Sequence, residues 1–114
     1  MGFWSALRVS WQAYKTRRKM NRQFSKRADP FSYDTTPYET ARLAAMDGAL
    51  GTGALGPVLE AGCAEGHFTE KLVRRSSRVL AVDISAVALA RARQRAPQAS
   101  FVEADLLAWE PGAE

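Results

Sequence analysis

Two glycines and two carboxylates lie close together in the segment VLEAGCAEGHFTEKL, residues 58–72. Gly62 and Gly66 follow a short apolar run and precede a helical pattern, which is typical of a turn between a strand and a helix. Such a turn lets the backbone approach a ligand closely, because glycine carries no side chain. Glu60 and Glu65 flank the glycines, and each would repel a pyrophosphate bound at the helix start. The turn therefore favours a cationic ligand over a phosphate.

The spacing of these glycines differs from the dinucleotide fingerprint G-x-G-x-x-G. Starting from Gly62, that fingerprint would require glycine at positions 64 and 67, where the chain has Ala64 and His67. A nicotinamide dinucleotide is therefore disfavoured, although an oxidoreductase fragment of that type stays an alternative. A ligand with sulfonium and ammonium groups and no phosphate, such as S-adenosyl-L-methionine, fits the two glutamates better.

Two further acids are expected at the ends of the next strands. Asp83 ends the apolar run in VLAVDIS, and Asp105 follows the run in FVEADLLAW. A carboxylate at the position of Asp83 can accept hydrogen bonds from both hydroxyls of a ribose, with Ile84 covering one face of the adenine. Asp105 is placed to accept from the adenine amino group, with Leu106 as an apolar neighbour.

Alternating strands and helices are expected to position these groups. Apolar runs predict strands at 57–62, 78–83 and 100–105, separated by helices at 67–75 and 84–96, the second capped by Ser85. An earlier helix begins with Thr36 as its cap, followed by Pro37 and Glu39 in a capping box. The pattern predicts an α/β fold with three strands in a parallel sheet, the first two of them buried, and with the carboxyl ends of all three at one edge.

The first residues differ sharply in charge from the rest. Residues 1–27 hold eight Lys or Arg and no acid, whereas the remaining residues carry a net charge of −4. A helix is predicted there, with Trp4, Leu7, Trp11 and Tyr14 on one face. We divide the chain into this basic amphipathic extension, 1–28, and an α/β domain, 29–114. The extension could dock on its own domain or a partner chain, lie on an anionic membrane surface, or contact nucleic acid.

The three strand-end motifs resemble the first three cofactor motifs of class I S-adenosylmethionine-dependent methyltransferases. GCAEGHFTEKL, followed by AVDISAVALARARQR and preceded by DPFSYDTTPYETAR, is similar to the nodulation protein S-like branch. The resemblance covers residues 29–111 and implies a Rossmann-like fold with S-adenosyl-L-methionine as cofactor. The family has a seven-stranded sheet, so the three strands here imply the N-terminal, cofactor-binding half of a longer enzyme. We expect the 114 residues to be inactive alone, with the first strand left as an unpaired edge.

The resemblance also implies roles for individual residues. The methionine and sulfonium site is implied for the following residues of the glycine turn: Glu60, Gly62, Cys63, Ala64 and Gly66. Asp83 and Ile84 would contact ribose and adenine, Asp105 and Leu106 would contact adenine, and Tyr38 and Arg42 would close over the cofactor, with Arg42 suited to its carboxylate.

Several positions carry narrower expectations. Ala64 replaces the family's usual glycine, which binding tolerates unless the position needs a positive φ angle. Cys63 is expected to be a small packing group, and His67 to face solvent or cap a helix. No catalytic residue and no metal ligand set is assigned.

The methyl acceptor is expected to be the nitrogen or oxygen of a small molecule or sugar. A single cysteine suits a reducing cytoplasm, with a peripheral membrane location as the alternative. One further hypothesis remains open: a non-catalytic protein that binds a membrane or nucleic acid and has a degenerate cofactor-binding fold.

Overall fold

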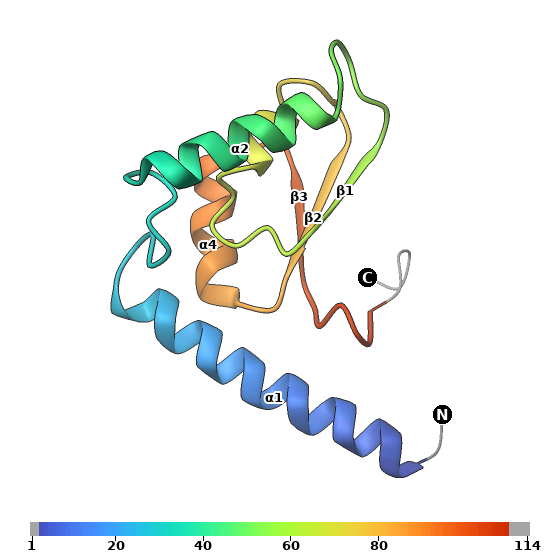
Figure 1. The fold of residues 1–114 in the computed structure, drawn as a ribbon. Helices are drawn as coiled ribbons and strands as arrows, with labels where there is room; N and C mark the ends of the chain where they lie inside the picture. Colours follow the sequence, from blue (N-terminus) through green and yellow to red (C-terminus); the bar gives the residue numbers. More distant parts are fainter. Residues whose placement is uncertain (1–2, 110–114) are drawn as a thin grey trace.

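The computed structural model describes residues 3–109, with side chains from residue 11 onward. Four helices and three strands follow one another along the described residues: α1 (Phe3–Lys26), α2 (Pro37–Ala49), β1 (Val58–Ala61), α3 (Thr69–Leu72), β2 (Val79–Asp83), α4 (Ala86–Arg95) and β3 (Ser100–Glu103). The α/β class and the alternation of strands with helices are confirmed. Figure 1 shows α1 along one side of the strands and α2 on the opposite side.

The three strands form one parallel sheet in the order β1-β2-β3. Val58 pairs with Val79, and Asp83 pairs with Glu103, so the carboxyl ends of all three strands meet at one edge. The predicted strand-end residues therefore gather at this edge. β1 has no second strand beside it within the described residues, as expected for an edge strand.

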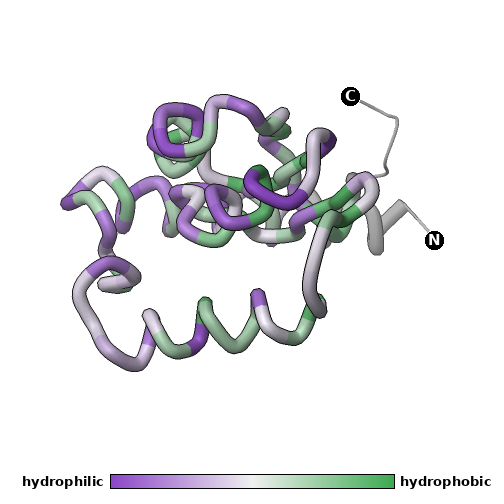
Figure 2. Tube along the Cα trace, turned by 90° about the horizontal axis from the view of Figure 1, so that it is seen from above, coloured by the Kyte–Doolittle hydropathy of each residue, from purple (hydrophilic) through white to green (hydrophobic). Residues whose placement is uncertain are grey.

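The core lies between the sheet and α4. Cys63, Ala81 and Leu89 form a buried cluster, and Phe101 packs against it. The expectation of a buried strand holds for β2 but is wrong for β1, where Leu59 is 50% exposed, because β1 lies at the sheet edge. Figure 2 shows hydrophobic and hydrophilic residues alternating along the helices.

The caps at two helix starts are confirmed, although Glu39 pairs with Arg42 instead of closing the predicted capping box with the Thr36 amide. The Thr36 hydroxyl accepts a hydrogen bond from the Glu39 amide at 3.4 Å, with Pro37 as the first helical residue of α2. Ser85 caps α4 by accepting from the Ala88 amide at 3.2 Å. These caps fix where the two helices begin, and therefore where the preceding loops end.

The helix expected over 67–75 is much shorter than predicted. α3 spans only Thr69–Leu72. Hydrogen bonds across three residues flank it: the Gly66 amide donates to the Cys63 carbonyl at 2.9 Å, and the Arg75 amide donates to the Leu72 carbonyl at 3.0 Å. These three-residue bonds are mixed with four-residue bonds, such as that from the Ser76 amide to the Leu72 carbonyl at 2.9 Å, so the regular α-helix is short.

α1 is the predicted basic helix, and its last turns dock on the domain. Phe24 is 1% exposed and packs edge-to-face with Phe31, with the two ring centroids 5.8 Å apart. The buried Ser85 hydroxyl donates to Asn21 Oδ1 at 2.6 Å, which ties α1 to the start of α4. Docking on its own domain, one of the alternatives from the sequence, is therefore observed for this part of α1. No helix of the described residues is long and apolar enough to cross a membrane.

Candidate functional site

The glycine turn is fixed against both β2 and α4. The amides of Gly62 and Cys63 both donate to the Val82 carbonyl, at 2.8 and 3.1 Å, which holds the turn against β2. Gly66 has φ +88°, and a Cβ placed there would lie 3.1 Å from both Cα and Cβ of Ala92. Gly66 therefore serves the close approach of α4 to the turn.

Ala64 adopts a left-handed conformation, with φ +49°. The sequence left open whether this position needs a positive φ, and it does. For an L-residue other than glycine this conformation costs about 1–2 kcal/mol. The Ala64 amide donates to Asp83 Oδ1 at 3.1 Å, so the strained turn positions the acid at the end of β2.

Asp83 is held from two sides. Its Oδ1 accepts from the Ala64 amide, and its Oδ2 accepts from the Ser85 amide at 3.1 Å. Each carboxylate oxygen offers two lone pairs, so each retains a site for a further donor such as a ribose hydroxyl. Ile84 beside it is half-buried. The first two sequence motifs thus converge on one carboxylate.

A cleft of about 410 Å³ opens between α2, β1 and the glycine turn. Its volume lies in the range typical of small-molecule sites. Five of the predicted site residues line it: Arg42, Glu60, Gly62, Cys63 and Ala64. Apolar side chains of α2, among them Leu43 and Met46, form the opposite wall. Six predicted residues do not line it: Tyr38, Gly66, Asp83, Ile84, Asp105 and Leu106. Of these, Tyr38 is 73% exposed on α2.

Glu60 is the acidic group of this cleft. Burial raises its pKa, the nearby charge of Asp83 adds to the rise, and a hydrogen bond donated by the Thr69 hydroxyl opposes it. A carboxylate that is costly to ionise gains from a cation brought beside it, because the cation favours the charged form. Glu60 therefore suits a positively charged ligand group.

Cys63 also lines the cleft but is poorly suited to attack a ligand. It is 4% exposed, and burial raises the pKa of its thiol well above the ordinary value. The thiolate, the reactive form, is therefore disfavoured. Its place in the core cluster confirms the prediction of a packing residue.

Glu65 corrects part of the electrostatic reasoning from the sequence. Instead of facing a ligand, it is 2% exposed and pairs with Arg91 Nη1 at 2.8 Å. Both of its carboxylate oxygens also accept from the Asp29 amide, at 2.9 and 3.1 Å. Its charge is balanced inside the protein, so the preference for a cation rests on Glu60 and Asp83.

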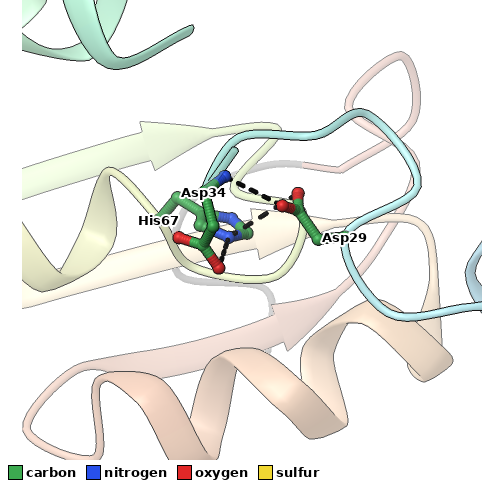
Figure 3. Close-up of side chains that lie close together, drawn as sticks. All are labelled: Asp29, Asp34 and His67. Carbon is green, nitrogen blue, oxygen red and sulfur yellow. Dashed lines mark hydrogen bonds and ion pairs between the residues drawn. The ribbon is translucent and has the colours of Figure 1, made fainter. Parts of the chain in front are cut away.

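His67 is also placed differently from the expectation that it faces solvent or caps a helix. It is 4% exposed, with Nε2 at 3.2 Å from Asp34 Oδ2 and 3.8 Å from Asp29 Oδ1. Figure 3 shows the imidazole between these two carboxylates. Burial raises the pKa of Asp34, but its pairing with His67 and Arg95 outweighs this and holds the pKa below its usual value. These contacts fasten the segment 27–34 over the glycine turn.

Tyr33 is a site residue that the sequence reasoning missed. It lines the cleft, stacks on the His67 ring at 4.9 Å, and lies beneath the Arg42 guanidinium, 5.4 Å from its carbon. The Nε of Arg42 also donates to Glu39 at 2.8 Å. The aromatic residue between acids in DPFSYD is the signal in the sequence that could have indicated it.

Asp105 retains an unused acceptor at the end of β3. Its Oδ1 accepts from the Leu107 amide at 3.1 Å, whereas Oδ2 is buried with no hydrogen-bond partner among the described residues. A buried acceptor without a donor is costly, so this atom suits a ligand that supplies one. Leu106 beside it is 44% exposed. This geometry fits the predicted contact with an adenine amino group.

Sequence comparison finds relatives among methyltransferases. Trans-aconitate 2-methyltransferase of Paracidovorax citrulli is 46% identical over 56 residues, which cover 47% of this chain and 22% of that protein. Nodulation protein S of Azorhizobium caulinodans is 37% identical over 75 residues, covering 65% and 36% respectively. The chain thus spans about a quarter to a third of the length of these curated relatives.

Two solved structures share the fold. One is the N-methyltransferase NodS from Bradyrhizobium japonicum WM9 in complex with S-adenosyl-L-homocysteine, at a TM-score of 0.76 and 32% identity, covering 85% of this chain and 51% of that chain. The DhpI-SAH complex matches at a TM-score of 0.62 and 30% identity, covering 82% and 48%. The sheet, helices and glycine turn described above therefore form part of a Rossmann-like methyltransferase fold.

One family model matches most of the chain. It is described as Nodulation protein S (NodS), and the match runs over residues 14–111, from within α1 to beyond β3. The span includes the glycine turn, both strand-end aspartates and the segment that carries Tyr33 and Arg42. The chain belongs to the nodulation protein S family.

Proposed function

We propose that this chain binds S-adenosyl-L-methionine at the carboxyl ends of its three strands and serves methyl transfer to a nitrogen or oxygen atom. The observation that carries the proposal is the Asp83 carboxylate, oriented by the amides of Ala64 and Ser85 beside a cleft that contains Glu60. The names of the relatives support it, since they include methyltransferases and complexes with S-adenosyl-L-homocysteine.

The charges and unused acceptors of the site fit the parts of this cofactor. Asp83 would accept from the ribose hydroxyls, and Asp105 Oδ2 from the adenine amino group. Glu60 would face the ammonium group, and Arg42 the carboxylate, of the methionine part. When bound, the cofactor supplies an electrophilic methyl group. The contribution of the chain is to orient that group, and orientation alone can remove a large part of a transfer barrier.

For the acceptor we propose a small molecule or a saccharide. The Bradyrhizobium relative is an N-methyltransferase, which supports nitrogen as the accepting atom. Neither Cys63 nor His67 is proposed as a base, because both are buried and held in packing contacts. The proposed location is the cytoplasm, in keeping with a single buried thiol.

The test is a calorimetric titration of the chain with S-adenosyl-L-homocysteine and, separately, with NAD⁺. We expect binding of the first ligand only. Asp83→Asn should weaken it by roughly 10- to 100-fold, because hydrogen bonds to a charged group contribute about 1.5–3 kcal/mol. Glu103→Gln is the matched control, since it removes an exposed acid from the end of the neighbouring strand. Binding of NAD⁺ at comparable affinity would instead favour the oxidoreductase alternative.

A further inference from the structure

The described part of α1 has two faces with different roles. Residues near Asn21 and Phe24 face the domain, through the contacts to Ser85 and Phe31. An adjoining side of the helix is solvent-exposed and consists of residues that recur at helical spacing: Trp11, Tyr14, Lys15, Arg18, Arg22 and Lys26. We call these six residues the outward face.

Aromatic rings and cations are interleaved on the outward face. Trp11 and Tyr14 stack with ring centroids 5.6 Å apart, yet they are 59% and 47% exposed. Lys15 Nζ lies 5.6 Å from the centre of the Trp11 ring, and the Arg18 guanidinium carbon lies 5.8 Å from that of Tyr14. Arg18 also donates to the Tyr14 hydroxyl at 3.2 Å. Amphipathic rings flanked by cations are characteristic of side chains at a membrane–water interface.

The charge of the outward face is not balanced by carboxylates of residues 11–109. No acid occurs in residues 1–27. Among the described residues, α1 forms an ion pair through Arg17, which contacts Glu103. Arg17 does not belong to the outward face. Lys15, Arg18, Arg22 and Lys26 have no carboxylate partner among the described residues. A surface that complements this face must therefore supply negative charge.

We propose that the outward face binds an anionic lipid surface, with α1 lying in the plane of the interface and the domain on the water side. This location goes beyond the proposed methyl transfer and does not depend on it. Trp11 and Tyr14 would reach the headgroup region, while the four basic residues contact anionic headgroups. Base stacking, the main use of exposed aromatic rings in binding single strands, is disfavoured because each ring already has a ring and a cation beside it.

The test measures partitioning of the full chain into vesicles by sedimentation. The probes are phosphatidylcholine vesicles with and without phosphatidylserine. Each basic residue near an anionic surface contributes about 1 kcal/mol, so Arg18→Gln with Arg22→Gln should weaken partitioning about 30-fold. Arg74→Gln with Arg78→Gln is the matched control, because it removes two exposed arginines outside α1 and should change partitioning by less than about threefold.

Two further measurements separate specific docking from other causes. Circular dichroism of both double variants should remain that of the parent, since none of the four arginines is buried. Trp11→Ala should weaken partitioning without changing net charge. Equal losses for the two double variants, or equal binding to vesicles without phosphatidylserine, would overturn the proposal. The proposal would also be overturned if the chain bound a labelled single-stranded RNA through Arg18 and Arg22 but did not bind the anionic vesicles.

Discussion

Replacing Ala64 with glycine should stabilise the protein, although it removes a methyl group. With φ at +49°, alanine bears about 1–2 kcal/mol of left-handed strain that glycine does not. Against this, glycine gains about 0.4–1 kcal/mol of freedom in the unfolded chain. The net expectation is roughly 0.5–1 kcal/mol of added stability, a rise of roughly 2–5 °C in Tm for a chain of this size. Thermal unfolding followed by circular dichroism measures it.

Ala90→Gly is the matched control for this prediction. Ala90 is exposed within α4, where glycine costs about 1 kcal/mol relative to alanine. The two substitutions make the same chemical change and should shift Tm in opposite directions. A loss of stability in Ala64→Gly similar to that in Ala90→Gly would refute the assigned conformation at position 64. The strain at this turn would then not exist.

Two further substitutions test the packing of the turn and the charge in the cleft. Gly66→Ala should lower the free energy of unfolding in urea by roughly 2–5 kcal/mol, because overpacking against Ala92 adds to the strain of a positive φ. Gly62→Ala has open space around it and should lower the free energy by only about 1–2 kcal/mol. Similar losses in the two variants would contradict the close approach of α4. Burial raises the pKa of Glu60 in the folded state above its pKa in the unfolded state. Between these two pKa values the folded state binds more protons than the unfolded state, so stability falls as pH rises through this range. Glu60→Gln should abolish this fall in a pH series of unfolding curves and weaken binding of S-adenosyl-L-homocysteine; an unchanged pH dependence would show that Glu60 is not desolvated.

Features set by neighbouring residues could be predicted from the sequence. The caps at Thr36 and Ser85 act within three residues, so their sequence patterns were sufficient to locate the starts of α2 and α4. The gathering of Glu60, Asp83 and Asp105 at one edge was predictable too. It follows from parallel pairing alone, which brings the carboxyl ends of successive strands together.

Features set by contacts distant in the chain could not be predicted. The sequence predicts that Glu65 faces a ligand and that His67 faces solvent or caps a helix, because nothing near them in sequence shows that residues 27–34 fold back over the turn. That segment is held by the Asp29 amide on Glu65 and by the contacts of Asp29 and Asp34 with His67. Tyr33 reaches the cleft only as a consequence of this fold-back.

The docking of α1 shows the same limit. The aromatic stripe ending at Tyr14 suggested one apolar face, and Phe24 lay outside it. In the structure Phe24 is the buried contact, whereas Trp11 and Tyr14 are exposed. Helical periodicity shows which residues share a face of the helix. Which face packs against the domain depends on contacts with residues that are distant in the sequence.

The most direct test of the central claim is an amide NMR titration of the chain with S-adenosyl-L-homocysteine. Ala64 and Ser85 donate their amides to the carboxylate that we assign to the ribose, so both signals should shift together as ligand is added. The amide of Leu107, which donates to Asp105, should move with them. If other amide signals shift but those of Ala64 and Ser85 do not move at saturation, the ligand binds elsewhere and the assigned site is contradicted.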